Sequence, residues 1–263
     1  MIDDRAERRP AQFAGRAGHL LACFLMWSAA VLAAQALRDV FAFVPGFVPW
    51  SGESPRAFLS SVGMAALLAA VAVFTAVNAG FLPAGATAGR FLAGVGLRPP
   101  VSIREALRWA AVGATGAVAL WLVWELVALL PALHSVPAAE DPRTVAVAQT
   151  SAGVRFCYGL VAPAPLEELQ YRAPVLALWL VLLTAKGCGG RLGSRWVRWS
   201  LTGVVSAASV VLFAAGHTMG GSANVAHAAA NAVITTAVTL WQRSLYPALA
   251  AHALYDAYAY TVG

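Results

Sequence analysis

Apolar runs of about 20 residues recur along this chain of 263 residues, and they constrain its fold more than any other feature. A helix needs about that length to cross the hydrocarbon core of a bilayer. Only 11% of the residues are charged, against about 25% in an ordinary soluble domain. Because a membrane-spanning segment must satisfy its own backbone hydrogen bonds, the sequence predicts an all-α, polytopic transmembrane helical bundle.

The apolar runs divide the chain into spans and three regions. We predict spans near 17–37, 58–80, 106–131, 151–184, 199–216, 222–241 and 245–262. The fourth run is too long for one straight crossing, and Pro163 and Pro165 should break it into one kinked span or two. The bundle therefore has about seven or eight spans. The regions are a cytoplasmic tail at 1–16, a two-span part at 17–100 and a core at 101–263.

Basic residues predict the side of the membrane on which each connection lies. The net charge of +6 comes mostly from residues between the apolar runs, which indicates topology and lipid headgroup contacts rather than nucleic-acid binding. Arginines gather before the first span and around 81–105 and 185–198, so the N-terminus and these connections should be cytoplasmic. This parity favours a single crossing between 150 and 186. Lys186 is the only lysine among 18 basic residues, which suggests a bacterial plasma-membrane protein from a high-GC genome.

Charged side chains interrupt the fourth apolar run at Glu167, Glu168 and Arg172. An ionisable group at membrane depth costs about 3 kcal/mol or more, so such groups usually indicate function. Positions four apart share a helix face, so Glu168 should pair with Arg172 while Glu167 faces elsewhere. Pro165 suits the first turn of a helix, which would place both glutamates near a helix N-terminus. A structural ion-pair cluster would explain Glu168 and Arg172 but leaves Glu167 without a partner.

Two further residue pairs stand one helical turn apart in later spans. Phe213 precedes His217 by four positions, and His252 precedes Asp256 by four. A neutral histidine inside a bundle can take a proton from a water held by a carboxylate, or donate a hydrogen bond to an oxyanion. Taken alone, either histidine is adequately explained as a packing or hydrogen-bonding residue. Their occurrence in order after the glutamate pair predicts a hydrolytic site.

The order Glu-Glu-x-x-x-Arg, Phe-x-x-x-His and His-x-x-x-Asn/Asp resembles the CAAX protease and bacteriocin-processing family of intramembrane proteases, also called the ABI family. Its eukaryotic relatives include the Ras-converting prenyl endopeptidase. The last element also lies in a Ser-Leu-Tyr-Pro context that begins at Ser244. The resemblance covers roughly 150–260 and implies a catalytic core in the C-terminal four to five spans.

The resemblance implies a role for each residue on the water side of the site. Glu167 would activate the attacking water, assisted by His217. Glu168 and Arg172 would hold the first carboxylate in place, with Phe213 among the supporting residues. Peptide-bond hydrolysis would then proceed without a covalent acyl-enzyme.

On the other side of the site, the resemblance makes His252 and the residue at 256 the oxyanion partners. Asp256 departs from the commoner asparagine, which can donate a hydrogen bond where an ionised aspartate cannot. Asp256 therefore orients His252, is itself protonated, or weakens the site. No cofactor is predicted, and the three cysteines share no metal-ligand spacing. Zinc held by Glu167, His217 and His252 is an alternative.

Three other polar residues have a structural interpretation beside a functional one. His227 and Asn231 form a second His-x-x-x-Asn pair, but the Ser-Leu-Tyr-Pro context is missing there. We therefore interpret them as interhelical hydrogen-bonding residues, with His227 close to the site. Glu125 either pairs with an arginine or lines a polar cavity, and we favour the structural role.

The leading prediction is an intramembrane endopeptidase that acts on a peptide or membrane-protein substrate. Peptide maturation, bacteriocin self-immunity and cleavage of a regulatory membrane protein are the roles that the resemblance implies in a bacterium. The first alternative is a non-proteolytic scaffold that uses the polar cluster to hold helices together and bind a partner. The second is a solute or proton transporter, which would predict inverted repeats that the sequence does not show. We expect the helices to be surrounded by membrane lipid. The sequence does not determine the oligomeric state.

Overall fold

The structure, a computed structural model, describes residues 93, 96–136, 138, 145, 147–161, 163–185 and 194–262. These residues form helices and no strand, in the order α4 (Ile103–Ala128), η1 (Pro131–His134), α6 (Ala152–Val161), α7 (Pro163–Ala185), α8 (Arg195–Ala215), η3 (Thr218–Gly220), α9 (Gly221–Gln242) and α10 (Tyr246–Val262). The all-α prediction is confirmed for them. The predicted spans at 17–37 and 58–80 lie outside the described residues, so the span count and the three regions stay predictions.

The start of α4 lies earlier than the predicted 106, and local capping explains the difference. Ser102 occupies the N-cap in an extended conformation, and its Oγ accepts the backbone N–H of Glu105 at 3.2 Å. A serine followed three residues later by glutamate is a typical helix start, which hydropathy alone does not detect. At the other end, α4 stops at Ala128 before Pro131 begins η1.

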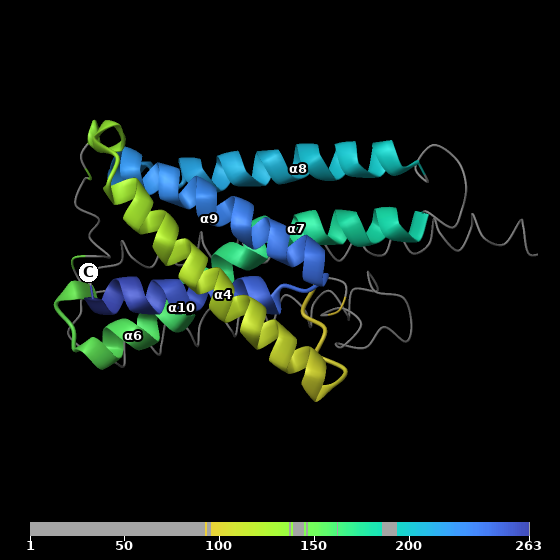
Figure 1. The fold of residues 1–263 in the computed structure, drawn as a ribbon, viewed down its shortest axis with the longest axis horizontal. Helices are drawn as coiled ribbons and strands as arrows, with labels where there is room; N and C mark the ends of the chain where they lie inside the picture. Colours follow the sequence, from red (N-terminus) through yellow and green to blue (C-terminus); the bar gives the residue numbers. More distant parts are fainter. Residues whose placement is uncertain are drawn as a thin grey trace, which may run out of the picture.

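The long fourth apolar run is broken where prolines predicted a break. Helix α6 ends at Val161, and α7 begins at Pro163, whose missing N–H costs nothing in the first turn of a helix. The two helices follow one another along the bundle in the same general direction (Figure 1). Pro165 therefore lies in the first turn of α7, and Glu167 and Glu168 follow it in the next turn.

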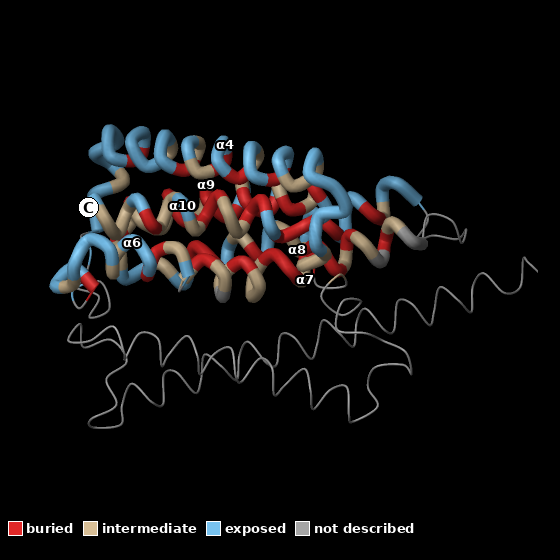
Figure 2. The backbone as a smooth tube through the Cα atoms, turned by 90° about the horizontal axis from the view of Figure 1, so that it is seen from below, coloured by how far each residue is buried: buried red, intermediate tan, exposed pale blue. Residues whose placement is uncertain are grey.

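The long helices pack side by side in alternating directions (Figure 1). Helices α8 and α9 form a hairpin whose buried contact is made by Phe213, Ala228 and Ala232. Helix α4 crosses obliquely over α9 and α10 and exposes its outer face, whereas α7, α9 and α10 carry much of the buried surface (Figure 2). Glu167, Glu168 and Arg172 on α7 and His252 and Asp256 on α10 therefore lie on helices that carry much of the buried surface.

Helix α4 approaches α10 closely because it presents glycines to it. A Cβ added at Gly113 would lie 2.6 Å from the Cβ of Ala250, and one at Gly116 would lie 2.7 Å from that of Ala251. These distances are too short for carbon atoms that are not bonded. Small residues allow the two backbones to approach in this way, as in membrane helix pairs.

The helix ends that border the predicted cytoplasmic connections share one end of the bundle. The start of α4, the end of α7, the start of α8 and the end of α9 lie together there (Figure 1). This is the arrangement expected if the connections around 81–105 and 185–198 are on one side of a membrane. Helices α4 and α8 are long and apolar enough to cross a bilayer, judged by length and composition. Which side of the membrane each end faces stays a prediction.

Candidate active site

Glu168 and Arg172 form the buried centre of the site on α7. The carboxylate Oε2 lies 3.5 Å from the guanidinium Nε, and neither side chain is exposed. The pairing follows from the four-residue spacing predicted above. Two opposite charges placed together in the interior offset part of the cost of removing each of them from water.

His252 on α10 contacts the same carboxylate. Its Nδ1–H donates a hydrogen bond to Glu168 Oε1 at 2.9 Å, since a carboxylate oxygen accepts. The imidazole is also almost fully buried. Sequence reasoning paired Glu168 with Arg172 alone, so the link between α7 and α10 is an addition from the structure.

The other imidazole nitrogen of His252 faces two more carboxylates. Nε2 lies 3.6 Å from Glu167 Oε2 and 3.6 Å from Asp256 Oδ2. Both distances are within ion-pair range but too long for direct hydrogen bonds. Glu167 keeps 26% of its side chain exposed, against 13% for Asp256 and none for Glu168. Of the three carboxylates around His252, Glu167 is therefore the most accessible to a small molecule.

His217 lies just beyond α8, where Phe213 positions it. Its Nδ1–H donates to the backbone carbonyl of Phe213 at 2.7 Å, because a carbonyl can only accept. The opposite nitrogen, Nε2, is then the acceptor in the neutral ring. The Phe213 ring contacts both imidazoles, with centroids 4.5 Å from His217 and 5.9 Å from His252. Among the described contacts, no direct hydrogen bond or ion pair joins His217 to Glu167, although the family resemblance implies that they act in one step.

Helix α9 supports Arg172 through a residue that sequence reasoning missed. The guanidinium Nε donates to Thr235 Oγ1 at 2.9 Å, and Thr235 Oγ1 donates to the carbonyl of Asn231 at 2.9 Å. The guanidinium carbon also lies 4.2 Å from the ring centroid of Phe213. The sequence contained one signal for the contact between Thr235 and Asn231. The two residues are four positions apart and therefore share a helix face.

The residues with a structural interpretation lie around this cluster rather than in it. His227 Nε2–H donates to the Leu120 carbonyl of α4 at 3.3 Å, and its ring contacts Tyr255 with centroids 4.7 Å apart. The side chain of Asn231 is buried, and its Oδ1 has no hydrogen-bond partner among the described residues. Glu125 is exposed on α4, where it makes no ion pair with another described residue.

Metal binding was the alternative for Glu167, His217 and His252. Within the described ranges, no group of three or more histidine, cysteine, aspartate or glutamate side chains is arranged to hold a metal ion. The contact of His217 Nδ1 with the Phe213 carbonyl leaves its Nε2 free. The zinc alternative therefore stays a prediction.

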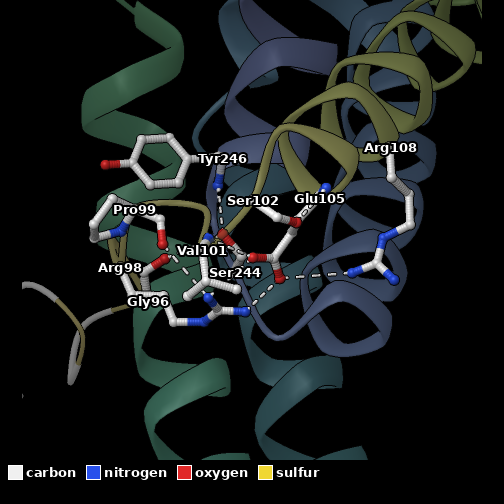
Figure 3. Close-up of polar contacts among 9 residues, drawn as sticks. All are labelled: Gly96, Arg98, Pro99, Val101, Ser102, Glu105, Arg108, Ser244 and Tyr246. Atoms are coloured by element: carbon white, nitrogen blue, oxygen red, sulfur yellow. Dashed lines mark hydrogen bonds and ion pairs between the residues drawn. The ribbon is translucent and has the colours of Figure 1, made fainter.

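A second polar cluster holds the start of α4 against the start of α10 (Figure 3). Arg98 binds Glu105 with two contacts, Nη2 to Oε1 at 2.6 Å and Nη1 to Oε2 at 3.3 Å. Just before α10, the backbone N–H of Leu245 donates a hydrogen bond to the Gly96 carbonyl at 2.9 Å. Trp109 of α4 stacks on Tyr246 of α10 with ring centroids 5.7 Å apart. These contacts position the helix that carries His252.

The C-terminal part of the chain matches a known protein family. Residues 149–258 match the family described as type II CAAX prenyl endopeptidase Rce1-like. The matched segment runs from just before α6 into α10 and contains all three sequence elements. Searches of the curated proteins and of the solved structures gave no match.

Proposed function

The chain carries an Rce1-like domain of the CAAX protease family at 149–258, and we propose that it is an intramembrane endopeptidase using a water activated by Glu167 and His217. The observation that carries the proposal is the position of His252. Its Nε2 lies 3.6 Å from the most accessible carboxylate, that of Glu167, while its Nδ1–H is held by Glu168. A base and a hydrogen-bond donor therefore lie 3.6 Å apart, and these are two groups that hydrolysis requires.

The water step assigns complementary roles to two residues. The water oxygen attacks the carbonyl carbon of the scissile peptide while its proton passes to Glu167. Because Nδ1 of His217 is committed to the Phe213 carbonyl, Nε2 is left to accept a hydrogen bond from the same water. The C–N bond then breaks, and the proton held by Glu167 moves to the leaving amine. No covalent bond to the protein forms in this sequence.

The oxyanion step uses His252 and Asp256. With both ring nitrogens protonated, His252 donates Nδ1–H to Glu168 and can donate Nε2–H to the oxyanion. Asp256 Oδ2, 3.6 Å from that nitrogen, helps to orient the ring. This role does not require Asp256 to donate a hydrogen bond, so the departure from asparagine is compatible with hydrolysis.

The proposal is tested with the full chain purified in detergent. The substrates are a peptide ending in a CAAX sequence, in farnesylated and unmodified forms, and a panel of membrane-embedded peptides. Glu167→Gln and His217→Ala should each abolish cleavage while far-UV circular dichroism stays unchanged. His134→Ala, an exposed histidine on η1, is the matched control and should cleave normally. Full activity of Glu167→Gln would overturn the assignment.

A scaffold role is the second candidate, and the burial of the network favours it. Glu168, Arg172 and Thr235 have no exposed surface and connect α7 with α9, while His252 adds α10. Such a network would hold helices together with or without catalysis. A cellular phenotype of gene deletion that Glu167→Gln restores as well as the wild-type protein would favour the scaffold.

A further inference from the structure

The guanidinium of Arg172 is held mainly through its Nε atom. The whole side chain is buried, and Nε lies 2.9 Å from Thr235 Oγ1 and 3.5 Å from Glu168 Oε2. In the part of the chain that the structure describes, Nη1 and Nη2 have no hydrogen-bond partner. The threonine is therefore the side chain that fixes the guanidinium beside Glu168, with the Phe213 ring covering it.

Thr235 is itself fixed as an acceptor. Its hydroxyl donates to the Asn231 carbonyl four residues earlier, a contact that selects one side-chain rotamer of threonine in a helix, and it also lies close to the Glu168 carboxylate. The remaining lone pairs of Oγ1 then face Arg172. The residue is fully buried, so water does not compete for this position from outside the bundle.

We propose that Thr235 is a positioning residue for the active site, an inference that rests on the proposed function. Thr235 orients Arg172, Arg172 holds Glu168, and Glu168 holds His252 through Nδ1. The contacts measure 2.9, 3.5 and 2.9 Å in that order and cross from α9 to α7 to α10. Thr235 touches none of the groups proposed to contact substrate. It acts on the oxyanion side of the reaction through the orientation of His252.

Helix packing is the competing explanation for a buried threonine, and α9 offers a matched control. Thr239 lies one turn farther on, is equally buried, and makes no hydrogen bond with its Oγ1 among the described residues. Thr235→Val and Thr239→Val both replace a hydroxyl by a methyl group of similar size. Thr235→Ser keeps the hydroxyl and removes the methyl group. Packing and positioning therefore predict different results across the three variants.

The kinetic experiment uses the full chain in detergent and a peptide that the wild-type protein cleaves. Thr235→Val should lower kcat about 10- to 100-fold, because a hydrogen bond to a charged group is lost, and should leave KM within about twofold. Thr235→Ser should restore most of kcat, and Thr239→Val should match the wild-type protein. A wild-type kcat in Thr235→Val, or equal losses in Thr235→Val and Thr239→Val, would overturn the inference.

A spectroscopic readout keeps the inference separate from the proposed function. In protein labelled with ¹⁵N-histidine, the Nδ1–H resonance of His252 is assigned by its absence in His252→Gln. At fixed pH, Thr235→Val should shift or broaden this resonance, whereas Thr239→Val should not. If the wild-type protein cleaves nothing, the proposed function fails and the spectrum still decides whether Thr235 positions His252. An unchanged resonance in Thr235→Val overturns the inference whatever the activity.

Discussion

His252 on α10 and Glu168 on α7 are joined by a buried hydrogen bond of 2.9 Å, although 84 residues separate them in the chain. The bond uses the nitrogen of His252 that points away from Glu167 and Asp256. It therefore fixes the ring so that the other nitrogen faces those two carboxylates at 3.6 Å. The two adjacent glutamates consequently have different environments, Glu168 being enclosed and Glu167 partly open.

The two glutamates should differ in their effect on stability. Glu168→Gln leaves the buried guanidinium of Arg172 without its counter-charge, and breaking a buried ion pair in this way costs about 3–5 kcal/mol in the free energy of unfolding. Glu167→Gln removes no arginine partner and should change the free energy of unfolding by less than about 1 kcal/mol. Denaturant unfolding in detergent, followed by tryptophan fluorescence, measures both. Equal stability of the two variants would contradict the assignment of Glu168 as the structural carboxylate.

Substitutions at Asp256 should separate orientation from charge. Asp256→Asn keeps the size of the side chain and can donate a hydrogen bond, so cleavage should stay within about threefold of the wild-type rate. Asp256→Ala removes the oxygen that faces His252 Nε2 at 3.6 Å, and kcat should fall about 10- to 100-fold. The measurement is kcat for both variants on one peptide. A loss in Asp256→Asn as large as that in Asp256→Ala would show that the carboxylate charge itself is required.

Much of the helical pattern could be predicted from the sequence because it depends on local properties. The length of an apolar run predicted a helix at 222–241, and the structure has it at Gly221–Gln242. Pro163 predicted the break between α6 and α7. The pairing of Glu168 with Arg172 also follows from spacing within one helix. These features need no information about how helices face one another.

The contacts between helices could not be predicted in the same way. The bond from Glu168 to His252 depends on the rotation of α7 against α10, which no local pattern encodes. Thr235 was missed because a single threonine in an apolar helix resembles ordinary packing until its neighbour on another helix is known. The hydrogen bond from His227 to the Leu120 carbonyl could not be predicted either, because every residue of α4 carries a backbone carbonyl.

The ion pair at the start of α4 should respond to charge reversal. Arg98→Glu places two carboxylates together and should lower the thermal unfolding temperature in detergent, as should Glu105→Arg. The double variant restores opposite charges and should recover part of the loss. Because the pair is partly exposed, the recovery should shrink as salt is raised from about 0.05 to 0.5 M. No recovery in the double variant would indicate that Arg98 acts through its contact with the Trp109 ring, 5.3 Å from the guanidinium carbon, instead.

The close approach of α4 to α10 should make Gly116 intolerant of a methyl group. Gly116→Ala would place a Cβ 2.7 Å from that of Ala251, and such overpacking costs about 1–3 kcal/mol in the free energy of unfolding. Gly203→Ala on α8 is the control, since a Cβ there meets no other atom within 4 Å. That variant should be neutral or slightly stabilising, because alanine favours a helix more than glycine does.

A second substitution tests the cause of the destabilisation expected for Gly116→Ala. Ala251→Gly removes the methyl group that the new Cβ would meet, so in the double variant much of the loss should be recovered. The coupling energy from the four proteins of the cycle should then be about 1 kcal/mol or more in the stabilising direction. Denaturant unfolding of the four proteins in one detergent provides the measurement. Additive losses would mean that α4 and α10 do not meet at these two residues.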